Sequence, residues 1–242
     1  MSLEPSPSIA AGKTIQWAVE GPFLRDQLLR LPGTGKPSGM DKQPARLPVW
    51  LGLEGLDGDR VADRRYHGGP DRSLCHYPLD HYVHCGRLYP HLRLGAGAFG
   101  ENISTMGLDE QQVCIGDRFR WGEALIEVSQ PRSPCASLDR RHDARGLAKQ
   151  LARSGRTGWL YRTLEPGEIA VGAALFLIER PYPAITVARL WRSYIDDATA
   201  DSELARLAEL DLLAMDYRKR FRQRLDSRRN RRDQGTLFLV VH

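Results

Sequence analysis

Short apolar runs, broken by Gly, Pro and Asp, dominate the chain from Thr14 to about Tyr182. Runs of this kind are typical of strands joined by tight turns, and many of them in succession predict a β-barrel or β-sandwich. We expect strands over 14–19, 47–51, 112–115, 118–121, 124–128 and 174–178. Helical periodicity interrupts twice, over 78–89 with Leu79, Tyr82 and Val83 on one face, and over 144–154 with Leu147, Ala148 and Leu151 together.

The pattern changes at Arg180-Pro181-Tyr182-Pro183, where two prolines indicate a boundary. Three short helices are expected beyond it, over 186–195, 201–210 and 214–225, with Thr186 and Asp201 as N-caps. Leu213, Tyr217, Phe221 and Leu225 form a narrow apolar stripe that predicts packing. The sequence is thus divided into a flexible N-terminus (1–12), a mainly β domain (13–182), a three-helix domain (184–230) and a tail (231–242).

Composition narrows the class of protein. With 242 residues, 41% hydrophobic and 27% charged, the chain is globular. Its net charge of +5 fits an anionic ligand without by itself indicating nucleic acid. The four cysteines form no C-x-x-C pair and no disulfide scaffold, which favours a reducing cytoplasm. The N-terminus lacks a signal-peptide pattern, and no apolar run reaches the ~18 residues of a membrane span.

A proline-framed cysteine is the strongest candidate for chemistry. The stretch Ser129-Gln130-Pro131-Arg132-Ser133-Pro134-Cys135 follows the expected strand 124–128, and its prolines should end that strand and stiffen the turn. Arg132 precedes Cys135, and Arg140, Arg141 and His142 follow it. Positive charge favours the thiolate, the form that attacks or binds metal. The plain alternative is a buried cysteine in an ordinary turn.

Three further stretches carry weaker signals. In Tyr66-His67-Gly68-Gly69-Pro70-Asp71-Arg72, the paired glycines allow a ligand to approach the backbone closely. In Phe99-Gly100-Glu101-Asn102-Ile103, the amide of Asn102 suits the edge of a heterocycle. Gly35-Lys36-Pro37-Ser38-Gly39, with Lys42 and Arg64-Arg65 beyond it, could hold a phosphate or form surface charge.

Two clusters support competing interpretations. His81, His84 and Cys85 share one helical face, as zinc ligands do, but no second spaced pair completes a structural site. The segment Arg218–Arg232 holds nine Lys/Arg with Asp226 as its one acid. A solvated helix face is favoured there over a nucleic-acid contact, because no aromatic residues alternate with the charges.

Four motifs in order resemble the MOSC domain (molybdenum cofactor sulfurase C-terminal domain). They are His67-Gly68-Gly69-x-Asp71, Gly100-Glu101-Asn102-Ile103, Ile115-Gly116-Asp117 and Gln130-Pro131-Arg132-x-Pro134-Cys135. Longer runs at 74–78, 119–126 and 158–161 are similar to the YiiM-like, 6-hydroxylaminopurine-resistance branch. The resemblance covers about residues 30 to 182, and the three-helix segment looks like the 3-alpha domain of this branch.

The resemblance implies a mainly β fold, a MOSC β-barrel with peripheral helices, followed by the three-helix domain. It implies that Cys135 is the catalytic cysteine and molybdenum ligand, and that Asn102 contacts the pterin of the molybdenum cofactor. Lys36, Lys42 and Arg65 are the candidates for holding its phosphate. The other cofactor-binding candidates come from the matching motifs: Gly100, Glu101, Arg132, Ser133, His67, Gly68, Gly69 and Asp71. The family also carries an association with pyridoxal phosphate binding.

The implied activity is reduction of N-hydroxylated bases and other small hydroxylamines to amines in the cytoplasm. Because the chain has no four-cysteine iron–sulfur run and no G-x-G-x-x-G loop, electrons should come from a separate flavoprotein reductase. A persulfide-forming sulfur carrier using Cys135 and a nucleic-acid-associated protein acting through the basic tail are the alternatives. No membrane partner is expected, nucleic acid is disfavoured, and the oligomeric state stays open, with a dimer among the alternatives.

One departure from the family pattern falls at Leu51-Gly52-Leu53-Glu54-Gly55-Leu56-Asp57-Gly58-Asp59, where a Leu-Gly-Leu-x-Gly-Asp run is spread out. The inserted residues should alter a loop near the site.

Overall fold

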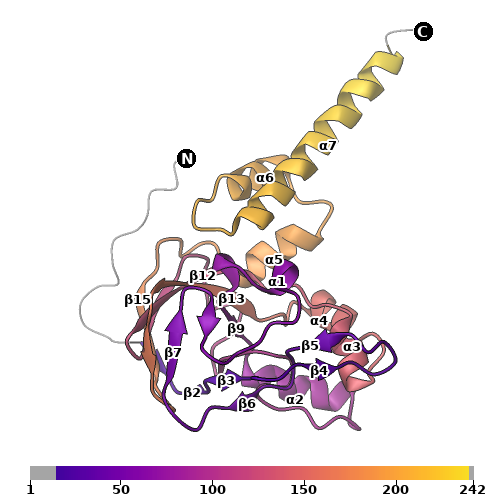
Figure 1. The fold of residues 1–242 in the computed structure, drawn as a ribbon. Coiled ribbons are helices and arrows are strands. Elements are labelled where there is room, and N and C mark those ends of the chain that lie inside the picture. The colour runs from indigo at the N-terminus through magenta and orange to yellow at the C-terminus, as the bar shows by residue number, and fades with distance from the viewer. Residues whose placement is uncertain (1–14, 240–242) are drawn as a thin grey trace.

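The computed structural model describes residues 15–239, with side-chain positions up to Arg232. The expected flexible segment 1–12 and residues 240–242 of the expected tail lie outside this range. A curled antiparallel sheet forms the centre of the molecule (Figure 1). Its strand order is β1-β15-β11-β12-β13-β9, with β1 Gln16–Trp17, β9 Leu74–His76, β11 Arg118–Trp121, β12 Ala124–Pro131, β13 Trp159–Glu165 and β15 Leu175–Glu179. The mainly β fold with peripheral helices is therefore confirmed.

Short strands complete the β part. They are β2 Val19–Glu20 with β10 Ser104–Thr105, β3 Phe23–Leu24 with β6 Gln43–Pro44, β4 Leu29–Arg30 with β5 Pro37–Ser38, and β7 Val49–Gly52 with β8 Gly55–Leu56 and β14 Gly167–Ile169. The inserted residues at 51–59 form the β7–β8 hairpin, and Asp59 follows it.

Four helices lie around the sheet before the C-terminal segment. They are α1 Arg64–His67, α2 Leu79–Leu88, α3 Ser137–His142 and α4 Leu147–Ser154, and a 3₁₀ turn spans Pro70–Arg72. The expected face of α4 is buried. The buried face of α2 differs from the expected one. It carries His81, Tyr82 and Cys85, whereas Val83 is 60% exposed.

Two expectations about strands and caps are wrong, and one strand is longer than expected. Residues 112–115 form a turn with one bridge, Cys114 to Thr186, because the Asp117 carboxylate accepts the Cys114 N–H at 2.9 Å. Strand β12 ends at Pro131, as expected from the prolines, but it is longer than the expected run 124–128, and Pro131 pairs with Trp159 of β13. Asp201 lies in the first turn of its helix, after Ala200.

The C-terminal segment folds as α5 Val187–Ile195, α6 Asp201–Ala208 and α7 Met215–Leu239, and α7 projects from the rest of the molecule (Figure 1). Thr186 caps α5, its hydroxyl accepting from the Arg189 N–H at 3.1 Å, as expected. The stripe of Leu213, Tyr217, Phe221 and Leu225 is buried.

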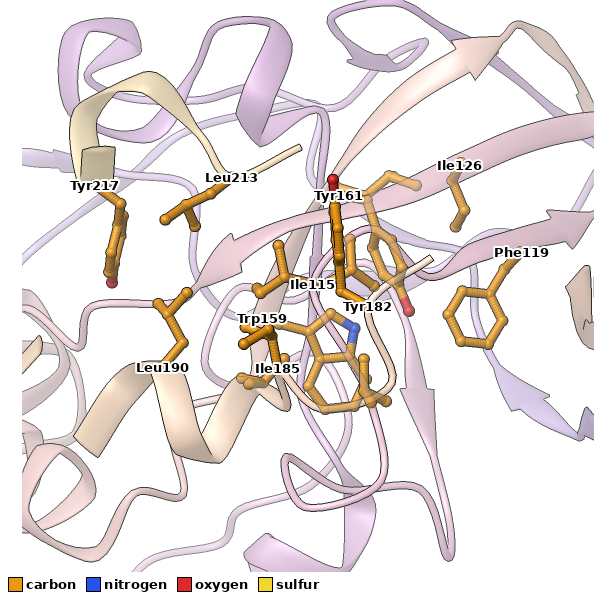
Figure 2. Close-up of a cluster of buried hydrophobic side chains, with 14 of the residues drawn as sticks. Ile115, Phe119, Ile126, Trp159, Tyr161, Tyr182, Ile185, Leu190, Leu213 and Tyr217 are labelled. Atoms are coloured by element: carbon orange, nitrogen blue, oxygen red, sulfur yellow. The ribbon is translucent and has the colours of Figure 1, made fainter. Parts of the chain in front are cut away.

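The helices and the sheet share one hydrophobic core. Figure 2 shows Leu190 of α5, Leu213 and Tyr217 in the same cluster as Ile115 and Trp159. Because both parts bury side chains in this cluster, each covers apolar surface of the other. The boundaries of 13–182 and 184–230 as separate domains stay a prediction.

Candidate functional site

A pocket of about 870 Å³ opens beside Cys135, a volume that suits a cofactor or nucleotide-sized ligand. Its walls come from distant parts of the chain: residues 31–42, residues 59–75, the 99–102 loop, the 130–140 turn, and helices α5 and α7. The sheet brings these segments together, since β12 leads into the turn with Cys135, while Leu160 of the neighbouring β13 and Cys75 of β9 beyond it also line the pocket.

Most of the predicted site residues line this pocket. They are Cys135, Asn102, Gly100, Arg132, Ser133, His67, Lys36 and Lys42. The remaining five, Glu101, Gly68, Gly69, Asp71 and Arg65, do not line it. Glu101, Asp71 and Gly69 instead have structural contacts or conformations near the pocket.

Glu101 and Asp71 organise the backbone around the pocket. The buried Glu101 carboxylate accepts from Tyr82 Oη at 2.5 Å and from the Gly97 N–H at 2.6 Å, so it shapes the loop that presents Asn102. Asp71 accepts from Arg162 Nε at 2.9 Å.

Gly69 has a φ of +95°, a left-handed conformation that glycine adopts without strain. Arg65 is exposed, its guanidinium over the Tyr66 ring.

The Cys135 thiol is set up to ionise. Burial acts to raise its pKa, but hydrogen bonds from His67 and Ser137 and the positive charge of Arg132 lower the pKa to about 6. The Ser137 backbone N–H also contributes to this lowering. The cysteine is therefore largely a thiolate at neutral pH, which is the state that ligates metals or attacks electrophiles.

The other three cysteines differ. Burial raises the pKa of Cys75, of Cys85 and of Cys114, the last to about 12. Cys75 nevertheless lines the same pocket as Cys135. Cys85 and Cys114 are buried in packed surroundings, where Cys85 lies 3.8 Å from Tyr77 Oη.

The side chain of Asn102 forms hydrogen bonds to three separate segments at the pocket wall. Its Oδ1 accepts from the Cys75 N–H at 3.0 Å, and its Nδ2 donates to the Phe23 carbonyl at 3.0 Å and to Asp59 Oδ2 at 2.8 Å. Asp59 also forms a buried ion pair with Lys42. The amide donors of Asn102 are thus already engaged in holding three segments together.

Two buried polar atoms in the pocket wall lack a partner among the described residues. They are Arg132 Nη1 and Gln130 Oε1. The other terminal nitrogen of Arg132 donates to the Phe99 carbonyl at 2.6 Å, which fixes its guanidinium in place. Because buried polar groups are nearly always hydrogen-bonded, a donor and an acceptor left free here indicate a polar ligand.

The pocket wall is cationic. Among the described residues, seven Lys and Arg line it, against three Asp. The cations are Lys36, Lys42, Arg60, Arg72, Arg132, Arg140 and Arg220, and the acids are Asp59, Asp63 and Asp216. This balance favours an anionic ligand.

The helical segment contributes to this pocket. Tyr217 Oη lies 3.1 Å from Ser133 Oγ and donates to the Pro131 carbonyl at 3.1 Å, so α7 holds the turn that carries Cys135. Tyr194, Asp216 and Arg220 also line the pocket. The C-terminal helices therefore form part of the pocket wall, because the apolar stripe that packs α7 also orients one face of it toward the turn.

Sequence reasoning missed Gln130, Asp59, Tyr194, Tyr217 and Arg220 as pocket residues. In the sequence, Tyr217 belongs to the apolar stripe and Arg220 to the basic run. Their position beside Cys135 depends on how α7 docks, which no local pattern encodes.

The zinc interpretation fails for the described residues. Within 15–232 no group of three or more His, Cys, Asp and Glu could hold a metal ion. His81 instead pairs with Glu110 at 2.7 Å, and that carboxylate also accepts from the Gly158 N–H. The helix face is thus a packing surface.

The basic run on α7 has structural contacts of its own. Arg224 donates to the carbonyls of Ser193 and Tyr194 at the end of α5, and Arg228 donates to the Thr199 carbonyl at 2.6 Å. Cationic side chains commonly satisfy carbonyls at helix ends. These contacts support the packing interpretation for this part of the run.

No helix in residues 15–239 combines the length and apolar character needed to cross a bilayer.

Comparison with known proteins identifies the family. A model of the MOSC domain matches residues 63–175. The chain is 47% identical over 148 residues to protein YiiM of Escherichia coli, a match that spans 60% of this chain and 66% of that protein. It is 36% identical over 202 residues to YflK of Bacillus subtilis, covering 91% of it. A protein of Gibberella moniliformis named "Reductase" is 37% identical over 158 residues, which is 28% of its length.

Solved structures agree with this result. The crystal structure of Escherichia coli YiiM superposes with a TM-score of 0.72 at 33% identity, covering 88% of this chain and 94% of that one. YiiM from Geobacillus stearothermophilus also gives a TM-score of 0.72, at 31% identity, covering 85% of this chain and 97% of that one. The chain therefore belongs to the MOSC-domain family, in its YiiM-like branch.

Proposed function

We propose that this protein is a molybdenum-cofactor-dependent reductase of N-hydroxylated bases and other small hydroxylamines. The observation that carries the proposal is the Cys135 thiol, whose pKa is lowered to about 6 at the wall of a large cationic pocket. A thiolate is a soft donor that suits a redox-active transition metal. Membership of the MOSC family and similarity to a protein named "Reductase" support this assignment.

The residues of the pocket fit this cofactor. Cys135 would ligate the metal, while the unpartnered Arg132 Nη1 and Gln130 Oε1 offer a donor and an acceptor to the pterin. Lys36 is exposed at the pocket, and no carboxylate among the described side chains pairs with it, so it can bind the phosphate. Lys42 is already paired with Asp59, and Arg65 lies outside the pocket, which makes them weaker candidates.

Asn102 supports the pterin site from the wall. Its Nδ2 donors are engaged with Phe23 and Asp59, which leaves a free lone pair on Oδ1 as its contribution to a ligand. We therefore propose Asn102 mainly as the residue that positions this side of the pocket.

When bound, the cofactor would supply the two-electron chemistry, and the protein would supply binding, orientation and electrostatics. In the reaction, the hydroxylamine takes up two electrons and two protons, its N–O bond breaks, and the amine and water leave. The contribution of His67 in this proposal is a hydrogen bond to the Cys135 sulfur, which lowers the pKa of the thiol. The electrons would come from a separate flavoprotein reductase.

Metal and pterin analysis of protein from a cofactor-competent cell tests the proposal first. Wild-type protein should contain molybdenum and pterin, and Cys135→Ser should lose activity and bind less metal. Cys114→Ser is the matched control, since this thiol is buried away from the pocket. Full metal content and activity in Cys135→Ser would refute the assignment.

Turnover assays test the reaction and the partner. Holo-protein with a chemical reductant should convert 6-hydroxylaminopurine to adenine, whereas NAD(P)H should support turnover only after a flavoprotein reductase is added. Turnover with NAD(P)H alone would contradict the partner claim. Molybdenum-free protein carrying sulfane sulfur on Cys135 would instead support the sulfur-carrier alternative, which uses the same thiolate.

A further inference from the structure

Arg220 of α7 is held at the pocket wall by stacking. Its guanidinium carbon lies 5.0 Å from the centroid of the Tyr194 ring on α5. Tyr194 in turn packs against Trp191, with ring centroids 5.4 Å apart and an interplanar angle of 23°, and against Tyr217 at 4.6 Å. The ring contacts position the guanidinium without using any of its hydrogen-bond donors.

The donors of Arg220 are available to a ligand. Among the described side chains, Arg220 makes no hydrogen bond and no ion pair. Its neighbours on the same helix differ, since Arg222 pairs with Glu209 at 3.0 Å and Arg224 donates to backbone carbonyls. A planar guanidinium with free donors suits bidentate binding of a phosphate.

The charge of the pocket exceeds what one cofactor phosphate requires. Two of the three lining acids, Asp59 and Asp216, are paired with Lys42 and Arg72. No carboxylate among the described side chains pairs with Lys36, Arg60, Arg140 or Arg220. A phosphate monoester carries about −1.5 to −2 charges at neutral pH. Together with the Cys135 thiolate and the three acids, it still leaves the wall net positive, which favours a second anionic group. A neutral free base would leave this charge uncompensated.

We propose that Arg220 binds the phosphate of the substrate, so that the pocket selects phosphorylated N-hydroxylated nucleotides over the corresponding nucleosides and free bases. This inference rests on the proposed function and specifies its substrate class. Arg220 is in this view a specificity-determining residue, supplied by the C-terminal helices to a site built on the sheet.

Steady-state kinetics of full-length holo-protein test the preference. Wild type should show a higher kcat/KM for N6-hydroxyadenosine 5′-monophosphate than for N6-hydroxyadenosine or 6-hydroxylaminopurine. Arg220→Ala should lower kcat/KM for the nucleotide about tenfold or more, as expected for loss of a charge-assisted contact, and leave the nucleoside nearly unchanged. Lys219→Ala is the matched control, because Lys219 is the adjacent cation on α7, is exposed and does not line the pocket beside Cys135.

Binding provides a readout independent of turnover. Adenosine 5′-monophosphate should bind the wild type more tightly than adenosine in calorimetry, and Arg220→Ala should remove that difference while Lys219→Ala keeps it. Molybdenum and pterin contents should be the same in all three proteins. Equal losses for nucleotide and nucleoside, or a lowered pterin content in Arg220→Ala, would overturn the inference. If no hydroxylamine is reduced and Arg220-dependent binding persists, the proposed function fails while the nucleotide site stands.

Discussion

At the residue scale, the four cysteines of this chain show that surroundings decide reactivity. Three of them have a raised pKa, chiefly because burial disfavours the thiolate. Cys135 is also partly buried, but the hydrogen bonds from His67 and Ser137 and the charge of Arg132 together outweigh desolvation and lower its pKa. A single soft, ionised sulfur therefore faces the pocket.

Alkylation should report this ionisation directly. The rate at which iodoacetamide modifies Cys135 should rise with pH through a midpoint of about 6, because only the thiolate reacts. Below that pH the sulfur is protonated and the rate falls. Peptide mass spectrometry follows each cysteine, with Cys114 as internal control, its pKa being raised to about 12. In His67→Ala the midpoint should move upward, and an unchanged midpoint would remove His67 from the thiolate's environment.

Asn102 should matter for stability as well as for the pocket. Asn102→Ala leaves the Cys75 N–H and the Phe23 carbonyl without their side-chain partner. A buried group left unsatisfied costs about 1–3 kcal/mol, so the free energy of unfolding should fall by that order. The substitution is thus expected to lower the stability of the protein as well as its cofactor occupancy. Urea denaturation measures it, and Lys36→Ala, at an exposed position, should leave stability unchanged.

At the element scale, strand β12 and helix α7 together define the Cys135 turn. The strand delivers the turn, and the Tyr217 hydroxyl binds both Ser133 and the Pro131 carbonyl. The prolines stiffen the backbone locally, but the position of the turn relative to the pocket depends on this tertiary contact.

Tyr217→Phe should distinguish the contribution of the Tyr217 hydroxyl's hydrogen bonds from that of the packing of its ring. The ring stays in the core, and loss of the hydroxyl should lower the free energy of unfolding by about 1 kcal/mol. The turn should also loosen, which raised backbone hydrogen exchange at residues 132–135 would show. Met215→Ala, at a residue that is 61% exposed, should change neither quantity. Unaltered exchange in Tyr217→Phe would mean that the prolines alone hold the turn.

At the scale of the whole molecule, the sheet and the C-terminal helices form one core. Leu190, Leu204, Leu213 and Phe221 are completely or almost completely buried, in the same cluster as the sheet residues. Burying one such side chain is worth about 1.5–3 kcal/mol, so the helices contribute a large share of the stability of the protein.

Truncation after Tyr182 should therefore destabilise the β part. The deletion removes the helical side chains from the core cluster that also contains Ile115 and Trp159, so the shortened chain should aggregate or unfold non-cooperatively. Circular dichroism melting and gel filtration test this expectation. A soluble, cooperatively unfolding fragment would instead support the predicted division into separate domains at Pro181–Pro183.

Much of the architecture could be read from local pattern. Alternating short apolar runs predicted the strands at 118–121 and 124–128, because a pleated strand repeats its environment every second residue. The Thr186 cap and the stripe on α7 were predicted for similar reasons, since capping and helical periodicity are short-range properties. The thiolate character of Cys135 was also expected from the cationic residues nearby in sequence.

Other features depend on contacts between segments far apart in the chain. Ser137 is only two residues from Cys135, but His67 reaches the sulfur because the fold brings residue 67 to the turn after β12. In the same way, Asp59, 43 residues before Asn102, accepts its amide N–H only in the folded chain. Arg220 looked like ordinary surface charge in the sequence. Docking of α7 places it in the pocket wall, because burial of the apolar stripe, a long-range effect, decides which way its neighbours on the helix point.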